Sequence, residues 1–551
     1  MSDQTAQVSS VRRGVRWTGV NPWSAGAVAI AVIVLAPLVA VVWFALTPTD
    51  NIWPHLLSTT LPRYLLNTGV MMAGTGALTA LVGTVTAWLV VMYRFPGRGW
   101  LQWALLMPLA VPAYVGAYAL VDFLDYAGPV QTTLRASFGW ATSRDYWFPQ
   151  IRTRGAAILV ISAALYPYVY LLARAAFREQ SGAGYEVARA LGAGPVARFW
   201  RVGLPLARPA IAAGVAVVMM ETVNDFGTVD YFAVQTLTTG IFSVWRQGGN
   251  LGGAAQIACV ILSVIVVLVA LEKVSRHRSR FATSARNVRP VTPASLTGAG
   301  AWAATAACAM PVLAGFVLPV GVLTSHALGA AQWTAPGLAE ALLRTLAICG
   351  IAAVLAVIGG VFMVYGTRLS GRTLPRLLLP VTGLGYAAPG AVLALGILVP
   401  LAAFDNGLAD MILRITGRDP GLLLTGSAGV LVLAYVVRFF AIAQGAADAA
   451  LGRVPASLPM AARSLGRNAG QTLRAVHLPL IGASVGSALL LTFVDAIKEL
   501  PATLMLSSQD TLSTRVYAKA SLENIAEAAP AALVICAVGL LAVILLARAH
   551  R

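Results

Sequence analysis

Twelve long apolar runs restrict what this sequence can fold into. Of its 551 residues, 58% are hydrophobic and only 11% are charged. A helix needs about 20 apolar residues to cross a bilayer, and each run approaches that length. The sequence therefore predicts an all-α, polytopic membrane protein rather than a soluble domain. The predicted spans are 25–46, 66–92, 101–124, 155–176, 209–225, 252–271, 300–324, 343–366, 376–402, 421–444, 481–499 and 529–547.

The distribution of positive charge predicts the orientation of these spans. The net charge is +18, and most Arg and Lys residues fall on one side if the N-terminus lies in the cytoplasm. We therefore expect both termini in the cytoplasm. Attraction to anionic lipid and the topology rule account for this charge, so nucleic acid is not an expected partner. The first run is too long for a signal peptide and lacks an obvious cleavage site, so we expect a retained span.

The chain contains two copies of one unit. Residues 186–205 read EVARALGAGPVARFWRVGLP and residues 460–479 read MAARSLGRNAGQTLRAVHLP. Gly192 aligns with Gly466, and Leu204-Pro205 aligns with Leu478-Pro479. The separation is the same in both cases and is roughly half the chain. Each copy lies between the fourth and fifth predicted span of its half. The repeat is therefore parallel, with six spans in 1–272, a basic cytoplasmic linker in 273–298 and six spans in 299–551.

Acidic residues recur at matching positions near the outer end of the fifth span of each half. The pairs are Glu221 with Asp225 and Asp495 with Glu499, each spaced so that both acids share one helix face. Carboxylates at membrane depth are costly and are usually functional. Oxygen ligands suit a hard cation, so we predict a transient acidic path for such an ion. We predict only transient binding, because a site that bound the ion tightly would oppose its release.

Structural roles for the same acids stay open at this point. The acids are also consistent with capping of adjoining helices, with the edge of the water phase, or with pairing to Lys498. Ferric iron, calcium and organic cations all tolerate oxygen ligands, so the residues alone do not choose among them. The few histidines and cysteines are scattered, which argues against a His/Cys metal site.

Proline and glycine near the ends of the third and ninth spans predict bends or broken helices, with simple packing as the alternative. These residues are Pro108, Pro112, Pro380, Pro389 and Gly390.

The duplicated segment resembles the EAA loop of ATP-binding-cassette importer permeases. The matching residues are Glu186, Ala188, Gly192, Leu204 and Pro205 in the first copy and Ala462, Gly466, Leu478 and Pro479 in the second. Met460 stands where the second copy would carry Glu. In that family the loop forms a short coupling helix that docks on a cytoplasmic ATPase. The resemblance implies a type I importer fold with two ATPase docking sites, the second weaker or differently paired.

Further stretches resemble the fused ferric-iron permeases of the same superfamily. They are ETVNDFGTVDYF (221–232), KELPATLML (498–506), LYPYVYLLARAAF (165–177), GYAAPGAVLALGILVPL (385–401) and TRVYAKAS (514–521). The resemblance implies alternating-access import of ferric iron across a bacterial inner membrane. It also implies two copies of an ATPase and a periplasmic ferric-binding protein that docks on the outer segments 125–153, 226–250, 403–420 and 500–527. Thiamine, sulfate and polyamine permeases share the fold and remain alternatives.

The chain itself is not expected to be an enzyme. A Walker A loop ends in Gly-Lys followed by Ser or Thr, and none of the lysines follows a Gly. The lysines are Lys273, Lys498 and Lys519. No cofactor is expected on this chain, and ATP with magnesium would bind the partner ATPase. A twelve-span secondary transporter is the alternative from another class, although the duplicated Gly and Leu-Pro segment argues against it.

Overall fold

The computed structural model describes residues 22–279, 291–329, 333–370, 373–383, 388–506 and 509–549. Eleven helices in this part are long and apolar enough to cross a membrane, and a pair bent by 94° makes a twelfth candidate. The predicted all-α fold with about twelve spans is confirmed. The N-terminal basic residues and residues 280–290 of the predicted linker lie outside the described residues.

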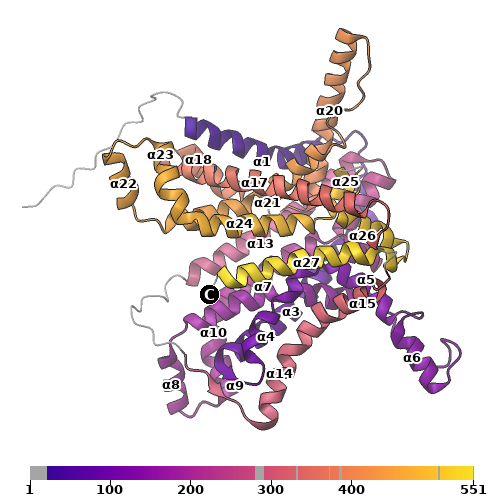
Figure 1. Ribbon diagram of the computed structural model, residues 1–551. Helices are drawn as coiled ribbons and strands as arrows, with labels where there is room; N and C mark the ends of the chain where they lie inside the picture. Colours follow the sequence, from indigo (N-terminus) through magenta and orange to yellow (C-terminus); the bar gives the residue numbers. More distant parts are fainter. Residues whose placement is uncertain are drawn as a thin grey trace, which may run out of the picture.

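The first half contains six spans joined by short helices (Figure 1). Its elements are α1 (Pro22–Leu46), α2 (Trp53–Ser58), α3 (Leu61–Met92), β1 (Tyr93–Arg94), α4 (Arg98–Ala104), η1 (Met107–Ala110), α5 (Ala113–Leu124), α6 (Pro129–Phe138), α7 (Arg154–Glu179), α8 (Gly182–Ala190), α9 (Pro195–Arg198), η2 (Phe199–Gly203), α10 (Leu204–Asn224), α11 (Gly227–Tyr231), α12 (Leu237–Phe242), η3 (Ser243–Gln247) and α13 (Leu251–Ser279).

The second half repeats this order. Its elements are β2 (Ala294–Ser295), α14 (Gly298–Val312), η4 (Leu313–Val317), α15 (Leu318–His326), α17 (Leu338–Ser370), α18 (Thr373–Thr382), α20 (Gly390–Thr416), α21 (Ala428–Gly452), α22 (Ser457–Ser464), α23 (Ala469–Thr472), η5 (Leu473–His477), α24 (Leu478–Ile497), α25 (Pro501–Leu506), α26 (Leu512–Ser521) and α27 (Ile525–Ala549). The short helices α9 and α23, and the π-helical turns η2 and η5, keep the register of the sequence repeat.

The third predicted span is broken rather than straight. Helix α4 and turn η1 lead to α5 through the 94° bend, with Pro108 inside η1 and Pro112 directly before α5. Proline lacks the N–H that would continue a helix, which explains the break. In the second half, Pro389 directly precedes α20, whereas Pro380 lies inside α18. The bend predicted at Pro108 and Pro112 is confirmed.

The first span of each half packs against the other half. Helix α1 contacts α17, α18 and α20, while α14, η4 and α15 contact α3, η1 and α5. Gly396 allows α20 to lie directly against the backbone of α1. A Cβ at this position would lie only 2.1 Å from the carbonyl oxygen of Pro37 in α1. The packing thus interlocks the two sequence repeats.

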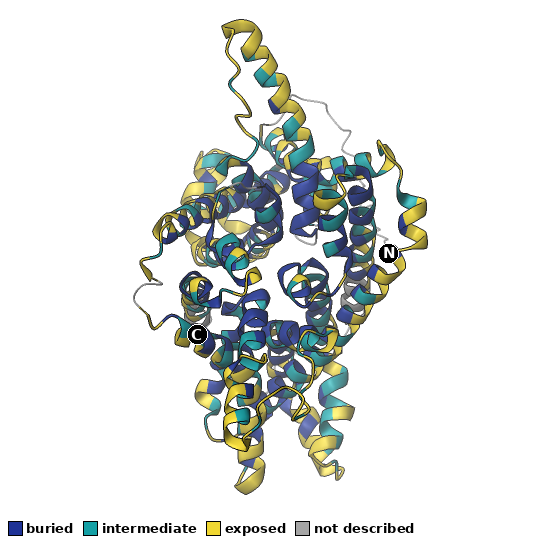
Figure 2. Cartoon of the chain, turned by 90° about the vertical axis from the view of Figure 1, so that its right-hand side faces the viewer, coloured by how far each residue is buried: buried dark blue, intermediate teal, exposed yellow. Residues whose placement is uncertain are grey.

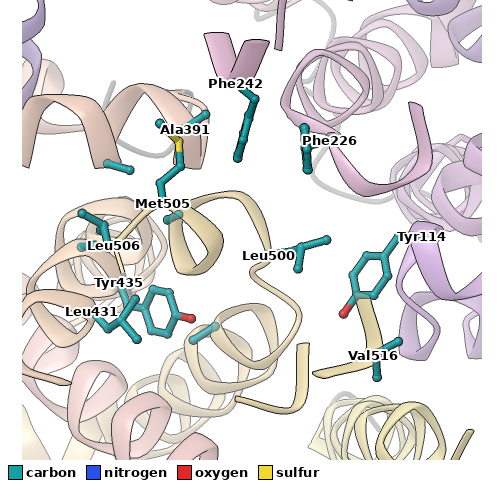
Figure 3. Close-up of a cluster of buried hydrophobic side chains, with 14 of the residues drawn as sticks. Tyr114, Phe226, Phe242, Ala391, Leu431, Tyr435, Leu500, Met505, Leu506 and Val516 are labelled. Carbon is teal, nitrogen blue, oxygen red and sulfur yellow. The ribbon is translucent and has the colours of Figure 1, made fainter. Parts of the chain in front are cut away.

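One hydrophobic core crosses the boundary between the halves. Figure 3 shows Tyr114 and Phe226 of the first half near Leu500 of the second, with Tyr435 further into the second half. A Cβ on Gly227 would lie within 2.8 Å of both Tyr114 and Leu500, so only glycine fits there. This contact fixes the ends of α10 and α24 relative to each other.

The molecule has two distinct ends (Figure 1). Helices α8 and α22 lie at one end, hereafter the α8–α22 end. Helix α6 and the C-terminal part of α20 project from the opposite end, hereafter the α6–α20 end, and the exposed arm at the top of Figure 2 is α20. Segments 125–153 and 403–420, predicted as outer loops, contain these projections.

The close contact between α1 and α20 predicts an unequal effect of two glycine substitutions in one helix. Gly396→Ala should lower the stability by about 1–3 kcal/mol, because its Cβ would strike the backbone of α1. Gly407→Ala in the same helix has open space and should be neutral or stabilise by about 0.5–1 kcal/mol. Thermal unfolding in detergent compares them, and equal midpoints would contradict the interlocked packing.

Candidate functional site

A cavity of about 150 Å³ lies between the two halves and is lined by all four predicted acids. Its walls come from η1, α5, α7 and the end of α10 in the first half, and from α21, α24 and the start of α25 in the second. The acids lining it are Glu221, Asp225, Asp495 and Glu499. The structure therefore brings together two acidic pairs that lie in different halves of the sequence.

Glu221 and Asp495 occupy matching places near the ends of α10 and α24, and both are partly buried. Tyr168 of α7 lines the same cavity. The predicted start of this span near Pro209 is wrong, because α10 begins at Leu204 and contains Pro209. Proline is tolerated inside a membrane helix where neighbouring helices surround the backbone groups that it leaves without partners.

Asp225 caps the short helix α11 that follows α10. Its carboxylate accepts hydrogen bonds from the backbone N–H of Thr228 at 3.0 Å, from that of Val229 at 3.1 Å, and from the Thr228 hydroxyl at 2.9 Å. A carboxylate at this position satisfies N–H groups that have no partner inside the helix. The capping interpretation is confirmed for this acid.

Glu499 occupies the corresponding place before α25 and has an additional partner. It accepts a 3.1 Å hydrogen bond from the backbone N–H of Ala502 and forms a 2.9 Å ion pair with Arg438 of α21. The Arg438 and Glu499 side chains are only 8% and 4% exposed. Arg438 also donates to the carbonyl of Ala388 at 3.0 Å. A Cβ on Gly390 would lie 2.0 Å from the Glu499 carboxylate, so glycine makes room for the pair.

Arg438 is a residue of the site that was not predicted from the sequence. Its position in the sequence could have indicated a role. Arg438 lies within the apolar run 421–444, where a charge is costly and is usually functional. The pairing proposed for Lys498 is confirmed with Asp495, at 3.8 Å, whereas Glu499 pairs with Arg438. Four acids and two cations thus line one cavity.

The acids do not form a metal centre in this arrangement. Across the part of the chain that the structure describes, no group of three or more His, Cys, Asp or Glu residues is placed to hold a metal ion. The cavity is lined by carboxylate, amide and phenol oxygens, which belong to Glu221, Asn224, Asp225 and Tyr168. Such oxygens attract hard cations.

The predicted coupling segments have the same local structure in both halves. Helix α8 carries Glu186 and Ala188, and helix α22 carries Ala462. Gly192 and Gly466 follow these helices with φ of +81° and +80°, the left-handed region that favours glycine.

Hydrogen bonding explains why glycine stands at both positions. The N–H of Gly192 bonds to the carbonyl of Arg189, and the N–H of Ala193 to that of Ala188. The same two bonds form at Gly466 and Arg467 in the second copy. This is a Schellman motif, which ends a helix through a left-handed residue. Leu204-Pro205 and Leu478-Pro479 then begin α10 and α24 after the π turns.

An exposed leucine precedes each of these glycines. Leu191 and Leu465 are both 82% exposed, although leucine is an apolar residue. The packing beneath them differs between the copies. Trp88 contacts the rings of Phe177, Tyr185 and Phe199 in the first half, whereas Tyr365 packs on His477 in the second.

Two related six-span halves, a charged cavity between them and paired short helices at one end define a membrane permease. Residues 79–280 match the family described as "Binding-protein-dependent transport system inner membrane component". The match covers 202 of the 551 residues and identifies this region as similar to a family of membrane permease subunits.

Curated relatives extend the similarity beyond that region. The chain is 26% identical over 482 residues to the Fe(3+)-transport system permease protein FbpB 2 of Haemophilus influenzae, covering 86% of this chain and 87% of that protein. It is 28% identical over 208 residues to the molybdenum transport system permease protein ModB of Escherichia coli, covering 36% and 87% respectively. It is 27% identical over 209 residues to the sulfate transport system permease protein CysT of Salmonella typhimurium, covering 36% and 70%.

The buried pair of Arg438 and Glu499 predicts a large effect on stability. Arg438→Met should destabilise the fold by about 3–5 kcal/mol, because it leaves a buried carboxylate without its counter-ion. Arg368→Met is a matched control, since its pair with Asp448 is exposed and should contribute only about 0–1 kcal/mol. Thermal unfolding of both variants measures the difference.

The double variant Arg438→Met/Glu499→Gln removes both charges and should recover most of the loss. If it unfolds at the same temperature as Arg438→Met, the ion pair is not the cause.

Proposed function

We propose that this chain is the permease of an ATP-driven importer that moves ferric iron across a bacterial cytoplasmic membrane. The observation that carries the proposal is the cavity between the halves, where four carboxylates meet at repeated positions. The ferric identity is supported by the relative that is named a Fe(3+)-transport permease and aligns with 86% of this chain. The molybdenum and sulfate relatives align with 36% each.

The arrangement of the acids suits passage of an ion rather than its storage. Ferric iron is a hard cation that prefers oxygen ligands, and the cavity supplies them. Asp225 and Glu499 are already engaged in capping and pairing, so these two carboxylates do not enclose an ion. A cation can therefore be attracted into the cavity and still leave it.

An oxyanion such as molybdate or sulfate is the second candidate, since Arg438 and Lys498 line the same cavity. Each of these cations faces an acid, at 2.9 Å and 3.8 Å, so neither is a free anion site. The balance of two cations against four acids favours a cationic substrate. Thiamine and polyamines are cationic too, and the uptake assay described below separates them from iron.

Two copies of a cytoplasmic ATPase would dock at the α8–α22 end, and both termini of the chain would then lie in the cytoplasm, as the charge distribution predicts. The exposed leucines Leu191 and Leu465 support this role, because an exposed apolar side chain at repeated positions suits insertion into a partner's cleft. ATP and magnesium would bind to the ATPase. Met460 is 59% exposed, so the second copy presents a thioether where the first presents the carboxylate of Glu186.

A periplasmic ferric-binding protein would dock at the α6–α20 end. Polar contacts join the halves near this end. Arg152 pairs with Glu523 at 2.8 Å, the Tyr517 hydroxyl donates to Asp230 at 2.7 Å, and His326 lies 2.7 Å from Asp122. In alternating access, the contacts of Arg152 with Glu523 and of Tyr517 with Asp230 would separate when the ATPase closes on ATP. Docking of the loaded binding protein would favour that separation, and ATP hydrolysis would restore the contacts.

Removal of the acids tests the substrate path. Glu221→Gln should reduce uptake of radioactive ferric iron by about tenfold or more, since one charge about 4 Å from an ion contributes roughly 1–4 kcal/mol. The combined Glu221→Gln, Asp225→Asn, Asp495→Asn and Glu499→Gln variant should show no uptake above background. The assay uses the assembled complex in proteoliposomes with its loaded binding protein.

Asp448→Asn is the control for this assay, because Asp448 is an exposed acid near the C-terminal end of α21 and does not line the cavity. Uptake of molybdate, sulfate, thiamine or spermidine in place of iron would reject the ferric assignment. Normal iron uptake by the quadruple variant would reduce the four acids to structural residues.

Capture of the ATPase tests the coupling segments. Gly192→Val and Gly466→Val should weaken co-purification of the ATPase, because a β-branched residue at positive φ is strained by about 1–3 kcal/mol. Gly194→Val is a matched control, with φ of −64° and open space around it. Unchanged capture by both variants would argue against these docking sites. Uptake driven by a proton gradient with no ATPase would favour a secondary transporter.

A further inference from the structure

The two halves do not contribute equally to the acidic cavity. Among the described residues, both cations that line it, Arg438 and Lys498, belong to the second half. In the alignment of the two halves, Arg438 corresponds to Ala164 and Lys498 corresponds to Asn224. Both cations therefore come from the second half, and at the position that matches Lys498 the first half carries the neutral amide of Asn224.

Lys498 reaches across the interface between the halves. Its ammonium donates a 2.6 Å hydrogen bond to the carbonyl of Leu109 and lies 3.8 Å from the Asp495 carboxylate. Leu109 belongs to η1, at the break in the third span, where a carbonyl released from the helix needs a donor. The ammonium therefore sits in the cavity under the attraction of Asp495 and a backbone dipole.

The opposite wall contains polar oxygens without partners. Within the described chain, the Asn224 Oδ1 atom and the Tyr114 hydroxyl have no hydrogen-bond partner, and their residues are only 4% and 5% exposed. Both residues line the cavity beside Glu221 and Asp225. Because both oxygens line the cavity, they are available to a hydrogen-bond donor or a cation that enters it.

We propose that Lys498 is a resident counter-cation, which occupies the acidic cavity of the resting permease and competes with the cargo cation for it. This inference rests on the proposed function in one respect, that the cargo is a cation. The cargo contacts the wall formed by Glu221, Asn224 and Asp225, while the Lys498 ammonium repels it from the other side. The competition keeps the cavity from retaining its cargo and leaves its charge partly balanced when the cargo is absent.

Terbium binding to the full-length permease in lipid nanodiscs tests the proposal. Tb³⁺ is a hard trivalent cation, and nearby tyrosine sensitises its luminescence. Lys498→Met should bind Tb³⁺ about tenfold more tightly than the native chain, equivalent to about 1.4 kcal/mol. Lys498→Gln also removes the charge but keeps an amide donor, so it should shift the affinity similarly. If Lys498→Met fails to fold, Lys498→Gln provides the measurement.

Two further variants assign the effect to the cavity. Lys519→Met removes an ammonium beside Glu527 on the surface and should leave the Tb³⁺ affinity of the native chain unchanged, because solvent and salt screen that charge. Adding Glu221→Gln to Lys498→Met should return the affinity towards the native value. Unchanged affinity in Lys498→Met and Lys498→Gln, or an equal gain in Lys519→Met, would overturn the proposal.

Ferric uptake in the assembled complex separates this proposal from the assignment of substrate. Lys498→Arg keeps the charge and should retain uptake, whereas Lys498→Met should slow it because the ion is released less readily. If the complex takes up no iron but Lys498→Met binds Tb³⁺ more tightly, the proposal for Lys498 is supported and the ferric assignment is wrong. If Lys498→Met takes up iron normally and its affinity for Tb³⁺ is unchanged, the ferric assignment is supported and the proposal for Lys498 is wrong.

Discussion

A charge at membrane depth must have a partner, and this constraint organises the centre of the molecule. Glu499 is stable there because Arg438 and the start of α25 satisfy its carboxylate, and Gly390 leaves space for it. Asp225 uses the start of α11 for the same purpose. Each acid is thereby fixed within its own half, and the packing of Gly227 against Leu500 joins the two halves beside the cavity.

Much of this architecture follows from sequence patterns. The apolar runs predict the spans, the duplicated segment predicts two related halves, and proline predicts the break between η1 and α5. These features depend on local chain chemistry or on internal comparison. The meeting of Glu221 and Asp495 in one cavity also agrees with the symmetry of the repeat.

The partners of the acids could not be predicted in the same way. Spacing along a helix shows which residues share a face, but it does not show which neighbouring helix that face meets. Arg438 lies on a different helix from the one that leads to Glu499, and Leu109 belongs to the other half from Lys498, so these contacts depend on tertiary packing. The packing of the first span of each half against the other half was not predicted, for the same reason.

That exchange has a consequence for how the chain is made. Helix α1 enters the membrane first, yet its contacts with α17, α18 and α20 become available only after more than half of the chain has been synthesised. Until then α13 covers part of α1, and lipid must cover the rest. The sequence of α1 suits this delay, since it contains no charged residue and is strongly apolar throughout. Completion of the fold therefore waits for the second half, and a chain that stops after α13 leaves α1 without most of its partners.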